Sequence, residues 1–194
     1  MSKRIAFLSA AALGALALTA TIVAPVSAQD RKMMKSEMSG EKTVMVGGAA
    51  MFPSKNIVEN AVNSKDHTTL VAAVKAAGLV GTLEGKGPFT VFAPTNAAFG
   101  KLPSGTVDTL VKPENKATLT KILTYHVVPG KLEASDLTDG KKLKTVQGEE
   151  LTVKRSGDTV MIIDAKGGSS TVTIPNVNQS NGVIHVVDTV LMPS

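Results

Sequence analysis

The hydrophobic pattern of this 194-residue chain changes its period well past the midpoint. In the earlier part, apolar residues recur every three or four positions, as at Leu70, Val74 and Ala77, which is the spacing of one helix face. From Leu151 and Val153 onward they alternate with polar residues, as in half-buried strands. Helices early and strands late predict an α+β domain, with short helices packed on mainly antiparallel strands. No segment repeats, so we expect one copy of this unit.

One stretch, GPFTVFAPTNAAF at 87–99, predicts a strand that turns directly into a helix. The apolar run Phe89–Ala93 is typical of a buried strand, and Pro94 ends it because proline cannot donate a ladder hydrogen bond. Thr95 or Asn96 then caps the helix. A catalytic elbow would need Gly-x-Ser-x-Gly, which is absent. We therefore interpret the stretch as a folding corner.

Local signals predict where the other elements begin and end. Ser54 and Asp66 suit the N-caps of two helices, and Gly78 ends the second of them. The segment Tyr125–Val128 is rich in β-forming residues and predicts a strand. After an Asn-Gly turn, Val183–Met192 predicts a long final strand.

Residues 1–28 have the composition of a secretory signal peptide. Lys3 and Arg4 form a short basic start, an apolar run follows, and Val26-Ser27-Ala28 supplies small residues for signal peptidase. The apolar run is long enough to span a bilayer as a retained anchor, but the cleavage site favours removal. We therefore expect no membrane span after cleavage and a secreted, extracellular or periplasmic protein.

Residues 29–52 divide into a polar tether and an apolar covering segment. Residues 29–43 are charged and lack a sustained period, which is typical of a flexible tether. The segment Val44–Phe52 is apolar and is expected to lie on the domain, which we place at 53–194. There it either completes the core or covers a groove.

Composition excludes several kinds of site and partner. The chain has no cysteine, so it forms no disulfide and no cysteine-ligated metal site. The formal net charge is +5, and the basic residues are scattered along the sequence. One Tyr and no Trp offer little surface on which bases could stack. Nucleic acid is therefore not an expected partner. The few aromatic residues require a core of Val, Leu, Ile and Ala. We expect a monomer.

Three histidines, His67, His126 and His185, raise the question of catalysis or metal binding. Zinc needs several close ligands, but there is no His-x-x-x-His pair and no cluster of acids. We therefore expect no catalytic residue, no cofactor and no metal. His126 and His185 are interpreted as strand residues whose ring nitrogens bond backbone groups, while a binding role for His126 stays open.

Three segments, in this order, resemble the fasciclin (FAS1) domain family. GPFTVFAPTNAAF resembles its first signature, ILTYHVVPGKL at 122–132 its central Tyr-His segment, and SNGVIHVVDTVLMPS at 180–194 its second signature. The chain as a whole resembles the small secreted, single-domain bacterial members. The resemblance implies a β-wedge flanked by several short helices, and extracellular adhesion without catalysis or cofactor.

The same resemblance implies candidate binding residues. In animal members, integrin contact has been assigned to the Tyr-His pair and the branched aliphatic residues beside it. The corresponding residues here are Tyr125, His126, Val127 and Val128. A second assigned motif centres on an Asp before the Asn-Gly turn, and Asn176 and Val177 stand at that place. A neutral amide does not ligate a divalent cation as a carboxylate does.

Taken together, these features indicate an exported, non-catalytic module that binds a cell-surface or matrix protein or a glycan. The alternative is an envelope protein that binds a small apolar or lipid-like ligand, with Val44–Phe52 covering its groove. A hydrolase is the third class, and its activity would have to disappear when His126 is replaced.

Overall fold

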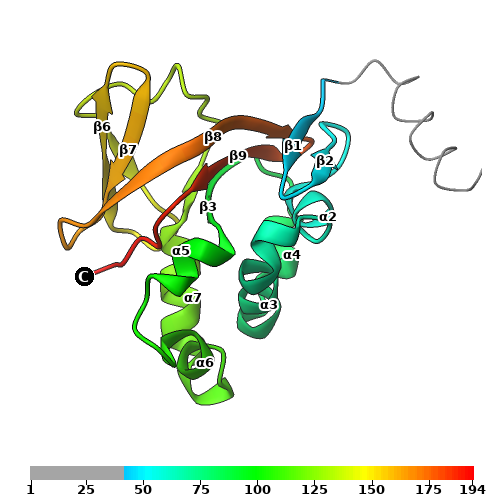
Figure 1. Cartoon of the computed structure of the whole chain (residues 1–194), viewed down its shortest axis with the longest axis vertical. Coiled ribbons are helices and arrows are strands. Elements are labelled where there is room, and N and C mark those ends of the chain that lie inside the picture. Colours follow the sequence, from blue (N-terminus) through cyan, green and yellow to red (C-terminus); the bar gives the residue numbers. More distant parts are fainter. Residues whose placement is uncertain (1–41) are drawn as a thin grey trace, which may run out of the picture. The chain divides into compact units, whose positions relative to one another are not determined.

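A seven-stranded sheet organises the computed structural model, which describes residues 42–194 (Figure 1). The strands lie side by side in the order β4 (Val127–Pro129), β3 (Phe89–Pro94), β9 (Gly182–Val187), β8 (Ser169–Gln179), β7 (Thr159–Ile163), β6 (Glu150–Ser156) and β5 (Lys142–Lys144). Only β3 and β9 pair in parallel, so the expected mainly antiparallel sheet is confirmed. The predicted signal peptide and the start of the tether lie outside the described residues.

Apart from β3, the elements between a small N-terminal hairpin and β4 are helices. They are α2 (Ile57–Ala61), the 3-10 turn η1 (Lys65–His67), α3 (Thr68–Ala77), α4 (Val80–Leu83), α5 (Asn96–Gly100), α6 (Thr106–Leu110), the 3-10 turn η2 (Pro113–Asn115) and α7 (Lys116–Tyr125). The hairpin consists of β1 (Val44–Val46) and β2 (Ala49–Met51). The predicted α+β class is confirmed, with helices early and strands late. No helix within 42–194 is long and apolar enough to cross a membrane.

Two apolar clusters form the core, and β3 and β9 contribute to both. One cluster lies between these strands and the helices, and includes Val91 and Ile184. The other lies toward the β6–β7 hairpin, and includes Phe92 and Val187. Figure 1 shows the helices and this hairpin on opposite sides of β3 and β9. As predicted, most buried side chains are Val, Leu, Ile and Ala.

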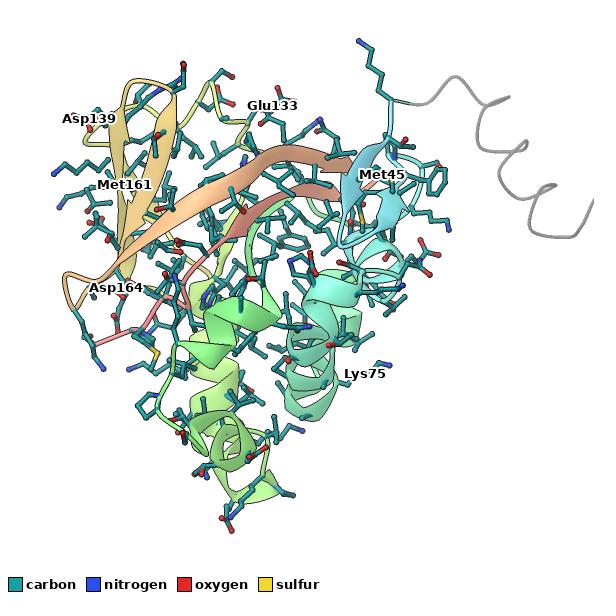
Figure 2. The ribbon with its side chains drawn as sticks, viewed as in Figure 1. Met45, Lys75, Glu133, Asp139, Met161 and Asp164 are labelled. Atoms are coloured by element: carbon teal, nitrogen blue, oxygen red, sulfur yellow. The ribbon has the colours of Figure 1, made fainter. Side chains whose placement is uncertain are left out.

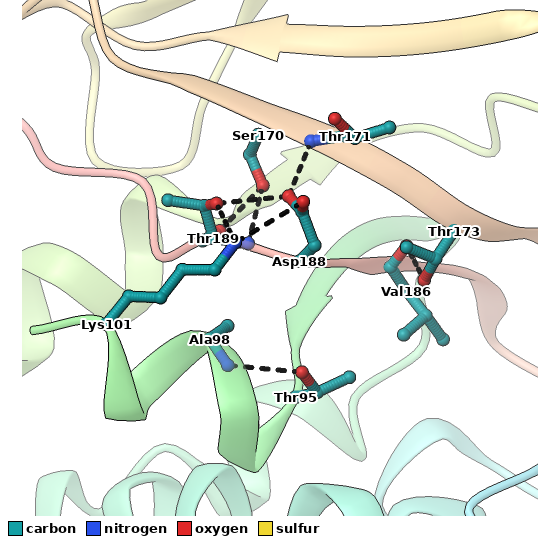
Figure 3. Close-up of polar contacts among 9 residues, drawn as sticks. All are labelled: Thr95, Ala98, Lys101, Ser170, Thr171, Thr173, Val186, Asp188 and Thr189. Atoms are coloured by element: carbon teal, nitrogen blue, oxygen red, sulfur yellow. Dashed lines mark hydrogen bonds and ion pairs between the residues drawn. The ribbon is translucent and has the colours of Figure 1, made fainter.

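The strand-to-helix corner is confirmed as a folding corner. The Thr95 hydroxyl accepts a hydrogen bond from the Ala98 amide at 3.2 Å and caps α5 (Figure 3). Asn96 serves a different helix, because its Oδ1 accepts from the Thr69 amide at 3.0 Å and its Nδ2 donates to the Lys65 carbonyl at 2.9 Å. One Thr-Asn pair therefore caps α5 and holds the start of α3.

The predicted N-caps of the first two helices are wrong. Asn56, not Ser54, caps α2: its Oδ1 accepts from the Glu59 amide at 2.8 Å, and the Glu59 carboxylate accepts from the Asn56 amide at 2.9 Å. Asp66 lies inside η1, so α3 begins only at Thr68. Both corrections arise because several capping residues stand close together and only the folded backbone selects one. The predicted end of α3 at Gly78 is confirmed by its left-handed backbone.

Two strand predictions also need correction. Tyr125 is the last residue of α7 and His126 its C-cap, so the strand begins at Val127. The final strand stops at Val187, well before Met192. The Asp188 amide still donates to the Thr171 carbonyl of β8 at 3.1 Å. After it the amides donate to side chains, as that of Met192 does to the Asp164 carboxylate at 3.1 Å.

A polar cluster joins the end of β9 to β8 and α5 (Figure 3). The Asp188 carboxylate accepts from the Thr171 amide at 2.8 Å and lies 3.4 Å from the Lys101 ammonium. Ser170 Oγ donates to the Thr189 carbonyl at 2.7 Å and accepts from its amide at 3.1 Å. Partial burial alone would raise the pKa of Asp188, but the hydrogen bonds from the Thr171 amide and the Thr189 hydroxyl, together with the charge of Lys101, outweigh it and lower the pKa.

The Asn-Gly turn between β8 and β9 is closely packed against the start of β3. Asn181 Oδ1 accepts from the Ile57 amide at 3.1 Å, and its Nδ2 donates to the Leu83 carbonyl at 2.7 Å. A Cβ at Gly182 would overlap the carbonyl oxygen of Phe89. Asn181 therefore ties two helix ends to the sheet, and Gly182 allows the close approach of the two strands.

We predict that Phe92→Ala destabilises the domain by roughly 3–5 kcal/mol, because the ring is fully buried and its removal leaves a cavity. The ring also stacks on His185 with centroids 5.7 Å apart. Urea unfolding monitored by circular dichroism measures the change. A loss below about 1 kcal/mol would contradict the burial of this ring.

We also predict that Gly182→Ala destabilises the domain by at least about 2 kcal/mol, because the added methyl group displaces the backbone of Phe89. Gly100→Ala is the matched control, since a Cβ there meets no atom within 4 Å and the residue is helical. The control is expected to be neutral or stabilising in the same unfolding experiment. Equal effects of the two substitutions would rule out the proposed clash.

Candidate functional site

The Tyr125 side chain is buried at the end of α7. Its hydroxyl accepts a hydrogen bond from the Ala165 amide at 2.8 Å and donates one to the Glu150 carbonyl at 3.3 Å. Burial raises the pKa of Tyr125; the Ala165 hydrogen bond opposes this, while the nearby carboxylates of Asp164 and Glu149 add to it. The side chain thus connects α7 to β6 and to the turn after β7, and it stays neutral.

His126 is also buried, and backbone groups satisfy both of its ring nitrogens. Nδ1 lies 2.8 Å from the Ile122 carbonyl and must donate to it, while Nε2 accepts from the Leu191 amide at 3.0 Å. Burial lowers the pKa of His126 to about 4, despite the opposing effects of the Ile122 carbonyl and of Asp164. The interpretation that backbone groups bond the ring is confirmed, at a helix C-cap and not on a strand.

Val127 and Val128 complete the segment as the first residues of β4. They lie opposite Val91 and Thr90 of β3, and both are buried. Their side chains enter different clusters, Val127 toward the helices and Val128 toward the hairpin strands.

Asn176 and Val177 lie in an irregular part of β8. Asn176 has a positive φ of 57° and is half-buried, whereas Val177 is buried. The Asn176 Oδ1 accepts from the Ala134 amide at 2.7 Å, and its own amide donates to His185 Nδ1 at 3.3 Å. His185 Nε2 then donates to the Leu132 carbonyl at 2.8 Å. His185 and Asn176 therefore tie β8 to the loop that follows β4.

The buried positions limit how these candidate residues can meet a partner. Tyr125 and His126 are 0% and 2% exposed, so a partner would reach their side chains only after the fold opened. Asn176 is the most accessible member, but its amide oxygen is already bonded. Their assignment to binding stays a prediction, and the geometry supports a structural role.

An accessible surface lies on the outer side of strands β5 to β7, which we name the sheet face. It consists of Lys144, Thr152, Lys154, Met161 and Ile163, all exposed or half-buried. Across the strands, Lys154 lies opposite Met161 and Thr152 opposite Ile163. Figure 2 labels Met161 on β7 of this hairpin. The alternation of apolar and polar residues from Leu151 onward predicts such a face, because the residues between the buried positions of a strand point outward.

The sheet face combines positive charge with apolar atoms. Lys142 at its edge is 3.3 Å from the Glu150 carboxylate. Lys144 and Lys154 form no ion pair or side-chain hydrogen bond with any residue of 42–194. Met161 and Ile163 belong to neither core cluster. Lys154 lies opposite Met161, whereas Lys144 lies opposite Glu150, whose carboxylate is close to Lys142. Two unpaired ammonium groups on one exposed face are suited to an acidic partner.

A second feature is an apolar cavity of about 90 Å³ beneath α3. Val46 and Met51 of the N-terminal hairpin line it and also belong to the helical core cluster. The covering segment thus completes the core and lines a cavity at the same time. The lining also includes Ser64 and His67, which sequence reasoning did not connect with it.

Ser64 and His67 do not form the arrangement of a hydrolase. The Ser64 hydroxyl lies 2.9 Å from His67 Nδ1, but both residues are buried and no carboxylate hydrogen-bonds the other ring nitrogen. Burial lowers the pKa of His67, against the Ala93 backbone carbonyl and the charge of Asp66. Within residues 42–194, no three His, Asp or Glu side chains lie close enough to hold a metal ion.

We predict that stability falls between pH 6.5 and about 4 because of His126. Its pKa is about 4 when folded and 6.5 when exposed, so the unfolded chain binds more protons in this window and unfolding is favoured as pH falls. The expected loss is about 3 kcal/mol over the window. Burial lowers the pKa values of His67 and His185 as well, which adds to the effect.

Urea unfolding at intervals from pH 7.5 to pH 4.5 measures this dependence. The control is His126→Gln, whose side chain does not titrate and whose stability is expected to fall less steeply. A free energy of unfolding that does not change between pH 6.5 and about 4 would show that the pKa of His126 is not lowered by folding.

Comparisons with known proteins agree with this architecture. A family model described as the fasciclin domain matches residues 65–193. Protein sll1483 of Synechocystis is 50% identical, with 79% of this chain and 82% of the relative aligned. The immunogenic protein MPB70 of Mycobacterium bovis is 34% identical over all of this chain and 98% of the relative. The cell surface glycolipoprotein MPB83 of the same species is 40% identical over 76% of this chain and 64% of the relative.

A solved structure shares the fold. It is a FAS1 domain pair from the insect cell adhesion molecule fasciclin I, with a TM-score of 0.65 and 20% sequence identity. The match covers 73% of this chain and 52% of the insect chain. The predicted β-wedge with flanking short helices is confirmed.

Proposed function

Because the chain belongs to the fasciclin domain family, we propose that it is an exported surface module that binds a protein or glycan and catalyses no reaction. One relative is a cell surface glycolipoprotein, and the similar solved structure comes from a cell adhesion molecule. The predicted signal peptide at 1–28 and tether at 29–43 support export and presentation of the domain. The expected location is outside the cell or in the periplasm.

The binding surface that we propose is the sheet face. The observation that carries this proposal is the pair of unpaired lysines, Lys144 and Lys154, on the same face as the half-buried side chains of Met161 and Ile163. The matching partner is an acidic surface protein or an acidic polysaccharide, whose charges would pair with the ammonium groups. The Tyr125–Val128 segment is less suited to contact, because its side chains are buried.

A capture experiment tests this function. The purified protein is immobilised, and surface protein and polysaccharide fractions of the source cell are passed over it. Lys144→Glu/Lys154→Glu is expected to weaken saturable capture by roughly tenfold, because acidic side chains would repel the partner. Lys86→Glu/Lys116→Glu is the matched control, since it makes the same change in net charge at exposed lysines outside the sheet face.

The results separate three cases. Capture that weakens only in the first variant supports the sheet face. Equal capture by both variants would support adhesion through a surface other than the sheet face. A folded Tyr125→Phe variant would then test the buried Tyr125–Val128 segment. Absence of saturable capture by the unmodified protein contradicts adhesion. The alternative function, binding of a small apolar ligand, depends on the cavity beneath α3.

A further inference from the structure

The turn between β8 and β9 contains Asn181-Gly182, the one Asn-Gly pair in the sequence. An asparagine before glycine loses its side-chain amide readily, because glycine has no side chain to shield its backbone nitrogen. That nitrogen bonds to the asparagine Cγ and closes a succinimide ring, while the side-chain nitrogen takes up the displaced amide proton and leaves as ammonia. Water then opens the ring to aspartate or isoaspartate.

The side chain of Asn181 is held away from this reaction by three hydrogen bonds. Its Oδ1 accepts from the Ile57 amide at 3.1 Å, and its Nδ2 donates to the carbonyls of Leu83 at 2.7 Å and Gly85 at 3.2 Å. The side-chain amide therefore cannot turn toward the Gly182 nitrogen unless it leaves these backbone groups.

The peptide group between Asn181 and Gly182 is fixed as well. The Asn181 carbonyl accepts from the Phe89 amide at 3.1 Å, and a Cβ at Gly182 would overlap the Phe89 carbonyl oxygen. Because Gly182 is buried, neither a base that removes its amide proton nor the water that opens the ring reaches it in the closed fold. The close approach that requires glycine here thus also creates the reactive pair.

The end of α4, which holds Asn181, is lightly packed. This helix has four residues, of which Leu83 is the buried one, and Glu84, Lys86 and Pro88 after it are exposed. Segments with few buried contacts open with a smaller free energy than the whole domain requires to unfold. The end of α4 can therefore release Asn181 while the rest of the domain stays folded.

We propose that Asn181 is a modification site that deamidates when the end of α4 opens locally, and that the product does not restore the closed turn. An aspartate carboxylate has no donor, so it repels the Leu83 and Gly85 carbonyls. Isoaspartate lengthens the backbone and displaces β9 from β3, where Phe89 and Gly182 are in close contact. Repeated opening thus converts folded protein irreversibly. The sheet face takes no part in this reaction, so either proposal can fail alone.

The test compares deamidation in the folded protein with that in protein unfolded by guanidinium chloride, at the same mildly alkaline pH. Trypsin releases residues 167–194 as one peptide, because no Lys or Arg follows Lys166, and fragmentation in a mass spectrometer locates each new acid. Asn176 and Asn178 in the same peptide precede valine and glutamine and are internal references. We expect Asn181 to react at least about tenfold more slowly in the folded protein, because the reaction waits for local opening.

Two substitutions distinguish local opening from global unfolding. Leu83→Ala removes the buried side chain that anchors the end of α4, and is expected to speed deamidation of Asn181 in the folded protein roughly tenfold. Leu137→Ala is the matched control, because it makes the same change at a fully buried leucine in the other core cluster. Its rate is expected to stay near that of the unmodified protein. Urea unfolding confirms that both variants fold.

The effect of the product is measured with Asn181→Asp, which is expected to unfold at a lower urea concentration than its control, Asn63→Asp. The control makes the same change in charge at an exposed asparagine, whose Nδ2 donates to the Glu59 carbonyl at 2.7 Å. The rate measurements on the unmodified protein remain decisive if Asn181→Asp does not fold.

Four results would overturn the proposal. A rate at Asn181 no higher than at Asn176 in the unfolded protein would show that the pair is not reactive. Equal rates at Asn181 in folded and unfolded protein would show that the fold does not protect it. Equal acceleration by Leu83→Ala and Leu137→Ala would show that the reaction needs global unfolding. Equal stability of Asn181→Asp and its control would show that the turn tolerates the product.

Discussion

The parallel pairing of β3 with β9 is the contact on which the rest of this domain depends. Phe89 lies opposite Gly182 and Pro94 opposite Val187, so the two strands match along their whole length. Neighbouring side chains on a strand point to opposite faces, and Phe92 therefore enters one core cluster while the residues on either side of it enter the other. Because β9 is near the end of the chain, the helices cannot complete their core until almost the whole domain is assembled.

Buried neutral histidines secure the irregular segments around this strand pair. His126 carries its proton on Nδ1 and joins the end of α7 to Leu191, whereas His185 carries its proton on Nε2 and joins Asn176 to Leu132. Each ring satisfies backbone groups that no neighbouring strand can reach. The conspicuous polar residues of the signature segments thus hold the fold together.

The parts of the fold that could be predicted from sequence are those governed by near neighbours. The corner at Thr95 and the helix end at Gly78 depend on a few adjacent residues, and both were predicted correctly. The helix that continues through Tyr125 was missed, because β-forming composition favours a strand there. The packing of α7 against α3 and the hydrogen bonds of the Tyr125 hydroxyl outweigh that local preference.

The candidate site could be predicted less well than the fold. By itself, the amino-acid sequence determined the α+β class, the order of its elements, and the family signature segments, since periodicity and turn chemistry are local properties. Only the tertiary structure decided that Tyr125 and His126 are buried, that Lys144 and Lys154 share an open face, and that His67 lines a cavity. The physical reason is that burial depends on contacts between residues far apart in the chain, such as that of His126 with Leu191.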